Sequence, residues 1–263
     1  MSSYPPDWSR PWWRDWRAWV EPVWGDWQRV ASGAEHDTAR LPAVLNSVSH
    51  GLPVRFVPQT ALPEGQSYEH FIFNERQVPT RDNLHDLFNG CCWRRFPRTK
   101  ARLNALQADV IGRVGVGATR GPLRDALTLF DENALLLQAS PALWGALQQH
   151  DWYTVLVTHR QDWCETQVIR PVVFGHALLE KLCQPYKSIT AHAYWIDPAV
   201  PADDASWDGW LAERLDAPHM ATKPFQPLPV MGIPEWCDAN ADRQFYADTQ
   251  VFRPLSKPRM AKG

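Results

Sequence analysis

Residues 79–104 read PTRDNLHDLFNGCCWRRFPRTKARLN, and this stretch predicts two consecutive helices separated by a proline. Four apolar residues fall on one face of a helix that we expect to run from Asp82 to Arg95: Leu84, Leu87, Phe88 and Cys91. Because that face is apolar, it must be buried. Pro97 then separates the first helix from a second, which we expect to run from about Thr99 to Arg113.

Polar side chains line the edge of this buried face. His85, Asn89 and Cys92 follow one another at helical spacing along the edge. Lys100 and Asn104 share a face of the second helix. A half-sheltered edge is where the wall of a cleft would lie, so these residues are candidates for contact with a ligand. The alternative is that His85 and Asn89 only satisfy backbone groups, as single polar residues on a helix edge commonly do.

The two adjacent cysteines, Cys91 and Cys92, do not indicate a nucleophile. Cys92 lies two helical turns from His85, about 10 Å, which is too far for the imidazole to take the thiol proton directly. The five cysteines are an odd number at irregular spacing, and neighbouring cysteines pair only under severe strain. We therefore expect reduced thiols, with Cys91 buried and inert and Cys92 partly buried.

The overall composition is typical of a globular protein. Of 263 residues, 44% are hydrophobic and 21% are charged, which is near the average for folded domains. The net charge of −2 provides no basic field that would hold a nucleic acid. No apolar run reaches the roughly 20 residues that span a bilayer, and the N-terminus lacks the apolar core of a secretory signal. We expect a cytoplasmic protein without a transmembrane segment, and nothing in the sequence indicates nucleic-acid binding.

Tryptophan is concentrated near the N-terminus, where seven of the 15 fall within the first 27 residues. We expect a helix after a Ser9 cap that Pro22 either ends or kinks, and a second apolar stripe after Pro22, so that the two parts form a helical hairpin. Packing of this hairpin onto the body is the preferred interpretation, because each buried indole removes a large apolar area from water. Two alternatives remain: attachment to a membrane surface, and a surface for a partner protein or for a homo-oligomer.

Helical and strand patterns mix along the rest of the chain without strict alternation. We expect helices from the caps Thr38 and Ser140 and over VVFGHALLEKL, and strands at PVRFVPQ, WYTVLVTH and SITAHAYWI. SYEHFIF fits either structure, ALTLFDENALLLQ has the pattern of a tight hairpin, and VGVGATRG that of a flexible connection. This mixture predicts an α+β fold, with helices and short, mostly antiparallel strands in one domain. We expect a tryptophan-rich helical extension over residues 1–31, a main domain over residues 32–254 and a flexible tail over residues 255–263.

A second group of polar residues lies downstream. His176 and Glu180 are four residues apart, so on a helix both can reach one ion or one substrate group, and His192 follows on an expected strand. Two imidazoles and one carboxylate suffice for a catalytic metal, so these three residues are candidate ligands of one divalent ion, with zinc or manganese favoured over iron. The alternative is an ordinary hydrogen-bonded pair on a helix.

A third candidate group lies in RDALTLFDEN. Asp125, next to Arg124, is expected to form a buried ion pair and to orient His85 if the two meet in space. Asp131 is expected to form a turn, because it ends an apolar run.

Several long strings of the sequence resemble a known bacterial family, and they occur in order. They are VPTRDNLHDLFNGCCWRRFPRTKARLNALQA, RDALTLFDEN, VFGHALLEKL, LPVMGIPEWCDAN and FYADTQVFRP. Together they resemble the bacterial domain-of-unknown-function family DUF3025, over about residues 54–254. The resemblance implies one continuous domain and a bacterial cytoplasmic protein, and it transfers no catalytic residue.

Two functions from different classes follow from these residues. The first is a hydrolase or related group-transfer enzyme acting on a small molecule, with a polar cleft formed by residues 80–104, 124–131 and 176–192. In this enzyme His85 would be the general base or a metal ligand, Asn89 and Lys100 would hold an oxyanion or phosphate, and Asp125 would orient or ligate. The second is a non-catalytic binding or scaffold protein that uses the tryptophan-rich hairpin.

Overall fold

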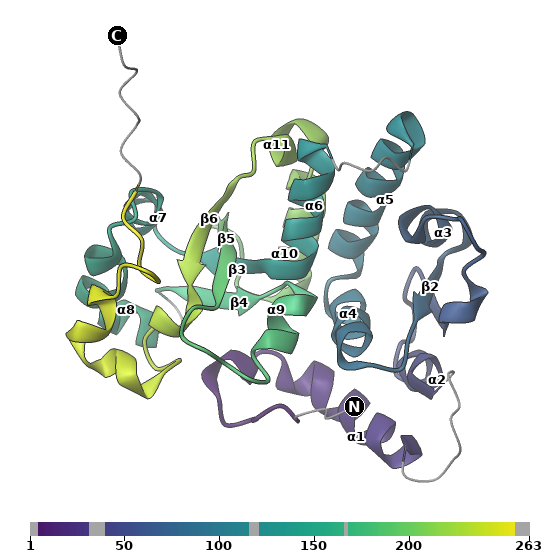
Figure 1. Ribbon diagram of the computed structural model, residues 1–263, viewed down its shortest axis with the longest axis horizontal. Helices are drawn as coiled ribbons and strands as arrows, with labels where there is room; N and C mark the ends of the chain where they lie inside the picture. Colours follow the sequence, from purple (N-terminus) through teal and green to yellow (C-terminus); the bar gives the residue numbers. More distant parts are fainter. Residues whose placement is uncertain (1–4, 32–39, 116–120, 166–167, 256–263) are drawn as a thin grey trace. The chain divides into compact units, whose positions relative to one another are not determined.

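The computed structural model of the protein describes residues 5–31, 40–115, 121–165 and 168–255 (Figure 1). The chain divides into two compact units, each assembled from separate stretches. The first unit comprises Met1–Ala134, Val173–Gln184 and Ala199–Pro224. The second comprises Leu135–Val172, Pro185–Pro198 and Phe225–Gly263.

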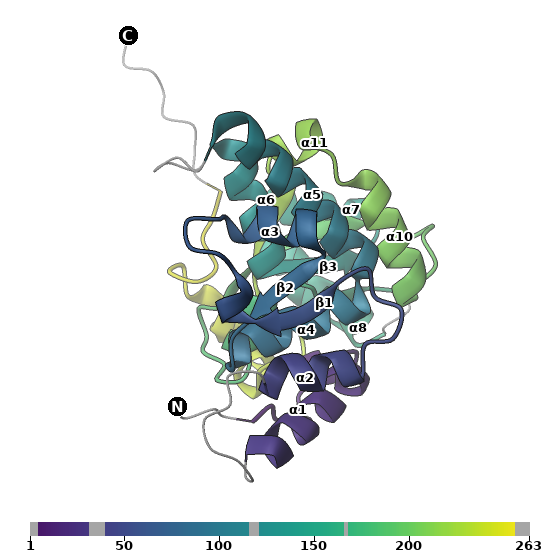
Figure 2. The same cartoon turned by 90° about the vertical axis from the view of Figure 1, so that its right-hand side faces the viewer.

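The first unit is mainly helical. Its helices are α1 (Arg17–Ala31), α2 (Arg40–Ser47), α3 (Tyr68–Glu75), α4 (Leu84–Arg95), α5 (Pro97–Val114), α6 (Pro122–Asn133), α9 (His176–Lys181), α10 (Asp204–Arg214) and α11 (Ala217–Ala221), with short 3-10 helices η1 (Pro11–Trp13) and η2 (Gln59–Ala61). Two short strands, β1 (Arg55–Pro58) and β2 (Gln77–Thr80), pair in parallel, as Figure 2 shows.

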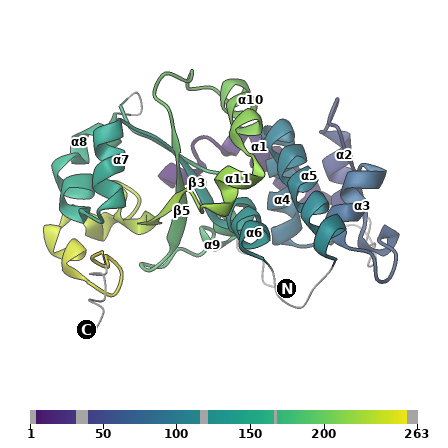
Figure 3. The same ribbon diagram turned by 90° about the horizontal axis from the view of Figure 1, so that it is seen from above.

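Helices α4 and α5 form the centre of the first unit, as the sequence predicted. The Asn83 side chain caps α4 by accepting a hydrogen bond from the backbone of Asp86. Pro97 begins α5, a position where its missing N–H costs no hydrogen bond. Helices α3 and α6 pack on α5, while α1 and α9 pack on α4 (Figure 3). Because α4 is covered on several sides, its residues 86–93 are all buried.

The N-terminal tryptophans contribute to the core of the first unit. Four of their rings are buried: Trp12, Trp13, Trp16 and Trp27. Trp13 stacks on Phe88 of α4 with ring centroids 5.7 Å apart, and Trp16 packs edge-on against Phe96. The indole Nε1 of Trp16 also donates a hydrogen bond to the carbonyl of Val173, at 2.7 Å.

Helix α1 continues through Pro22, so of the two expectations for this proline, an end or a kink of the helix, the end is wrong. A proline inside a helix costs about 3 kcal/mol or more because it removes one hydrogen bond. Val20 and Val23, on either side of Pro22, are fully buried, and their burial offsets that cost.

The second unit is built on a four-stranded sheet. The strands are β3 (Ala134–Gln138), β4 (Arg170–Val173), β5 (Thr190–Ile196) and β6 (Phe225–Pro229), in the order β4-β3-β5-β6. Strands β5 and β6 are antiparallel, with Thr190 opposite Pro229 and His192 opposite Pro227. The other elements of this unit are α7 (Pro141–Gln148), a π-helical turn η3 (Thr154–Thr158), α8 (Arg160–Cys164), and 3-10 helices η4 (Val230–Gly232), η5 (Asp238–Ala241) and η6 (Arg243–Ala247).

The predicted α+β class is confirmed, and several individual elements are too. SITAHAYWI forms β5, PVRFVPQ contains β1, and Ser140 caps α7 by accepting a hydrogen bond from the backbone of Leu143. SYEHFIF, which fitted either structure, forms α3. The Thr38 cap and most of VGVGATRG lie outside the described residues. Among the helices described, none is both long and apolar enough to cross a bilayer.

Two segment predictions are wrong. WYTVLVTH forms a helical turn, not a strand, because α7 and α8 pack against it and bury Val155 and Leu156, so packing overrides the strand preference of its β-branched residues. ALTLFDENALLLQ forms the end of helix α6 followed directly by strand β3, not a hairpin. Ala126, Leu127 and Phe130 are buried at helical spacing, although the same segment also alternates as a strand would.

Candidate functional site

Two histidines from distant parts of the sequence face each other in the first unit. His85 lies in the first turn of α4, and His176 is the first residue of α9. Their Nε2 atoms are 3.1 Å apart, and the ring planes are inclined at 78°. Two ring nitrogens at this distance need a proton between them, because two facing lone pairs would repel each other.

The outer nitrogen of each ring shows which histidine holds that proton. Nδ1 of His176 lies 2.8 Å from the backbone carbonyl of Asp131. A carbonyl can only accept, so His176 donates from Nδ1, and its Nε2 is the acceptor when the ring is neutral. Nδ1 of His85 lies 3.0 Å from the carboxylate of Glu180. His85 therefore donates from both nitrogens, to Glu180 and to His176, and all three contacts are satisfied when His85 is an imidazolium.

The surroundings push the pKa values of the two histidines in opposite directions. The hydrogen bond to Glu180 raises the pKa of His85, and burial opposes this only in part. Burial lowers the pKa of His176 to about 3, although the nearby Asp131 carboxylate favours the charged form. His176 is 7% exposed and His85 is 35% exposed. A pair of titratable groups with divergent pKa values is the usual arrangement for acid–base chemistry.

A close backbone contact between α9 and α6 places His176 beside Asp131. The amides of Phe174 and Gly175 both donate to the carbonyl of Ala134, at 3.0 Å and 2.9 Å. Gly175 lies so close to the end of α6 that a Cβ atom there would clash with the backbone of Glu132. The absence of a side chain at Gly175 therefore lets α9 begin directly against α6.

Behind His176, the Asp131 side chain belongs to a buried polar network. Lys100 of α5, 4% exposed, donates hydrogen bonds to Asp131 and, at 2.8 Å, to Asn89 of α4. Asn89 in turn donates to the hydroxyl of Tyr68, at 3.1 Å. Burial opposes the ionisation of Asp131, but the ammonium group of Lys100, with a smaller effect of His176, outweighs it and lowers the pKa of Asp131. The network thus keeps a negative charge beside His176.

The structure brings together five of the residues proposed from the sequence. His85 contacts both His176 and Glu180, and Asn89 contacts Lys100. The buried Lys100 donates to both Asn89 and Asp131, so in this structure Asn89 helps to hold the ammonium group that orients Asp131. Whether they also hold an oxyanion remains a prediction.

The expected ion pair of Asp125 with Arg124 is wrong. Asp125 instead pairs with Lys223, where both side chains are nearly half exposed, and Arg124 lies 3.5 Å from Glu69. The turn-forming role of Asp131 is also wrong, because residue 131 lies inside helix α6. It is Asp131 that takes the place beside the histidines expected for Asp125.

The three predicted metal ligands do not form one group in a single unit. Glu180 and His176 both contact His85, whereas His192 belongs to β5 of the second unit, where its ring packs edge-on against Phe225. Over the described parts of the chain, no group of three or more His, Cys, Asp or Glu side chains has the geometry to hold a metal ion. Metal binding by His176, Glu180 and His192 stays a prediction, without support from this geometry.

Sequence reasoning missed two members of the network, Asp131 and Tyr68. The signal for Asp131 was present: with Pro122 as a helix start, Leu127, Phe130 and Asp131 fall on one side of a helix. Tyr68 follows the Ser67 cap of α3, but no sequence pattern links it to Asn89.

Both cysteines of α4 are fully buried and serve as donors. The thiol of Cys92 contacts the carbonyl of Phe174 at 3.2 Å, and that of Cys91 contacts the carbonyl of Trp19 at 3.6 Å. Burial raises the pKa of Cys91 to about 12 and raises that of Cys92 as well. Neither thiol is therefore a nucleophile at neutral pH.

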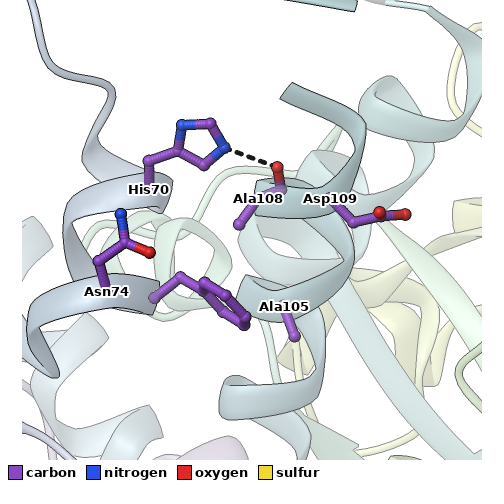
Figure 4. Close-up of a pocket in the computed structure, with 6 residues that line it drawn as sticks. His70, Asn74, Ala105, Ala108 and Asp109 are labelled. Atoms are coloured by element: carbon purple, nitrogen blue, oxygen red, sulfur yellow. Dashed lines mark hydrogen bonds between the residues drawn. The ribbon is translucent and has the colours of Figure 1, made fainter. Parts of the chain in front are cut away.

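A separate, shallow pocket of about 380 Å³ lies between α3 and α5. Figure 4 shows the His70 ring extending from α3 toward α5, with Nε2 directed at the carbonyl of Ala108, and the Asp109 side chain turned away from His70. The histidine is thus used to hold α3 on α5. None of the residues lining this pocket belongs to the set formed by Glu180, His85, His176 and Asp131, which we call the His85 group.

The fold and this group define an α+β protein with a hydrogen-bonded chain running from Glu180 through His85 and His176 to Asp131. The polypeptide belongs to the family DUF3025, which is described as a protein of unknown function. The family model matches residues 54–256. All four residues of the hydrogen-bonded chain fall inside the matched region. Comparison with curated proteins and with solved structures gives no match.

Proposed function

We propose that the protein is an enzyme of the hydrolase or group-transfer class that uses His85 as its general acid and base. The observation that carries this proposal is the contact between Nε2 of His85 and Nε2 of His176, at 3.1 Å, between rings whose pKa values are displaced in opposite directions. Glu180 orients the His85 ring through Nδ1. His176, Asp131 and Lys100 act as positioning residues behind it.

The direction of the pKa shifts explains how His85 would exchange its proton with a substrate. His176 is a weak base, since burial lowers its pKa to about 3. A more basic substrate atom near His85 therefore competes well for the Nε2 proton. Transfer of that proton leaves the bond from Nδ1 to Glu180 intact, so the ring keeps its orientation and can accept a proton in the reverse step.

Exposure determines which residues of the hydrogen-bonded chain can meet a substrate. The side chains of His85 and Glu180 are 35% and 41% exposed, while His176 and Lys100 are buried. We therefore assign substrate contact to His85 and Glu180. The substrate is a small molecule with a group that is activated by proton transfer, such as an ester, an amide or a phosphate ester.

A panel of chromogenic carboxylic esters, anilides, phosphomonoesters and phosphodiesters tests this function. We expect turnover of at least one class, with a loss of about 100-fold or more in His85→Gln, the usual contribution of one general acid or base. His159→Gln is the matched control, because His159 pairs with Asp162 at a similar exposure, 36% and 38%, in the second unit. Equal activity of the His85 and His159 variants would refute the proposal.

The alternative of a scaffold protein has less support. The rings of Trp13 and Trp16 are fully buried inside the first unit, so they are not available to a partner. A location in the cytoplasm remains part of the proposal, and it is supported by the state of the five cysteines, all of which are free thiols.

A further inference from the structure

The second unit contains a cavity of about 350 Å³ that shares no residue with the His85 group. Its walls come from three places in the sequence: the turn after α7, the facing ends of β5 and β6, and the segment at residues 250–253. This volume is at the small end of the range for sites that bind small molecules.

One wall of the cavity is aromatic and rigid. The Nε1 of Trp152 donates to the carbonyl of Arg253 at 2.8 Å, and Nδ1 of His150 lies 3.1 Å from the same oxygen. The two rings lie 5.0 Å apart. His150 has a φ of 53°, a left-handed conformation that glycine usually occupies at the end of a helix. At this position the chain therefore carries an imidazole next to the cavity instead of the usual glycine, which has no side chain.

The floor of the cavity comes from the paired strands. Residues opposite each other in an antiparallel pair point to the same face of the sheet, and Thr190 lies opposite Pro229. Pro227 is two residues before Pro229, so it shares that face. Two apolar pyrrolidine rings and Thr190 thus line the same cavity as the aromatic wall.

Polar groups at the rim favour an anionic ligand. Arg253 is the charged residue among the described residues that line the cavity, and Ser188 adds a hydroxyl donor, whereas the Thr190 hydroxyl donates to the carbonyl of Ser188 at 3.3 Å. Among the described residues that line it, none carries a carboxylate. A flat ring suits the space between the indole and the prolines, and a carboxylate suits the guanidinium, which binds carboxylates through two parallel hydrogen bonds.

We propose that this cavity binds a small planar aromatic carboxylate, with its ring against Trp152 and the two prolines and its carboxylate on Arg253. The site is independent of the function proposed above.

Titration calorimetry on the full chain with three probes tests the site: benzoate, its neutral analogue benzamide, and the non-planar cyclohexanecarboxylate. We expect saturable binding of benzoate, weaker binding of both analogues, and a loss of about tenfold or more in benzoate affinity for Arg253→Gln, as for one charge-assisted hydrogen bond. Arg243→Gln, an exposed arginine of η6 outside the cavity, is the matched control and should bind as the wild type does.

Two results would overturn the proposal: no saturable binding of benzoate at millimolar concentration, or equal affinities of the Arg253 and Arg243 variants. His85→Gln should leave benzoate binding unchanged. Loss of benzoate binding in that variant would mean that the ligand occupies the His85 group instead, so the two proposals can fail separately.

Discussion

Two Lys–Asp pairs of the first unit show how burial decides what an ion pair contributes. The side chains of Lys100 and Asp131 are 4% and 21% exposed, whereas those of Lys223 and Asp125 are 45% and 44% exposed. Both pairs have the same N···O distance of 2.5 Å. Coulomb attraction in water is weak and screened, but a charge left alone in the interior is strongly unfavourable. The two pairs should therefore differ in their effect on stability.

Replacing each lysine by methionine tests this difference. Lys100→Met leaves the Asp131 carboxylate without its cation, and we expect it to lower the free energy of unfolding by about 3–5 kcal/mol. Lys223→Met should lower it by less than about 1 kcal/mol. Urea unfolding followed by tryptophan fluorescence measures both values, and similar losses in the two variants would contradict this account.

The buried His176 predicts that stability falls in acid. Its pKa is about 3 in the folded protein and 6.5 in the unfolded chain, so between these values the unfolded state binds the extra proton. The free energy of unfolding should then decrease by up to about 1.4 kcal/mol for each pH unit as the pH falls from roughly 6.5 toward 4. In His176→Asn this contribution to the slope should disappear. A slope unchanged by the substitution would mean that His176 is protonated in the folded state.

His85 should act in the opposite direction. Its pKa is raised in the folded state by Glu180, so its contribution to stability is fully present below the unfolded pKa and is lost as the pH rises through the folded pKa. We expect His85→Gln to reduce stability more at pH 5 than at pH 9. Urea unfolding at the two pH values measures the effect, with Glu180→Gln as a second variant that removes the negative charge beside His85 while keeping an oxygen acceptor. A larger loss at pH 9 would contradict it.

Among the elements, the position of α9 on the end of α6 controls the histidine pair. Gly175 allows this contact, because any larger residue would clash with the backbone of Glu132. We expect Gly175→Ala to shift α9, to separate His176 from Asp131 and to cost about 1–3 kcal/mol, as overpacking does. Gly25→Ala in α1 is the control, since a Cβ atom there meets nothing within 4 Å and alanine favours the helix.

Unfolding experiments on both glycine variants, together with the His85 ring signals in NMR spectra, measure the effect. If Gly175→Ala left both the free energy of unfolding and the His85 signals unchanged, α9 would not need the close contact of Gly175 with the backbone of Glu132.

The elements that could be predicted from the sequence are those in which one periodicity dominates. The helix containing His85 was predicted because four apolar residues repeat at helical spacing, although its cap, Asn83, was not predicted. For α6, helical and alternating patterns coincide over the same residues, and only the packing of α5 and α9 on α6 decides between them. That ambiguity also hid Asp131, whose side chain was assigned to a turn.

The meeting of His85 with His176 could not be predicted from sequence patterns at all. The spacing of His176 and Glu180 indicates only that they share a helix face. Which residue they face depends on the contact of Gly175 with α6, and nothing in the local sequence encodes that partner. The sequence therefore supported a shared cleft of these segments as a hypothesis, but it did not indicate which side chains meet in it.

At the scale of the whole molecule, the core of the first unit extends beyond the family match. The match begins at residue 54, yet Trp13 and Trp16 pack on Phe88 and Phe96, which lie inside it. The tryptophan-rich segment is therefore an integral part of this core. That is consistent with the predicted packing of the segment on the body, although the proposed boundary at residue 31 stays a prediction.

Removing one buried indole tests the contribution of this segment. We expect Trp16→Ala to lower the free energy of unfolding by about 3–5 kcal/mol, as for other buried aromatic residues. Trp24→Ala should cost clearly less, because Trp24 is only half buried and packs edge-on against Trp27. Deleting residues 1–31 should give an insoluble or unfolded chain. A soluble, folded deletion variant that has only lost self-association would favour the scaffold function instead.

The interleaving of the two units sets the order in which the protein can be completed during its synthesis. The chain passes from one unit to the other after Ala134, Val172, Gln184, Pro198 and Pro224. His85 precedes His176 by 91 residues, so at roughly 5–20 residues per second it is made several seconds to about 20 seconds before its partner. Until α9 emerges, Asp131 and Lys100 are present without the histidine they support. A nascent chain that stops before residue 176 therefore carries only the first half of the proposed acid–base centre.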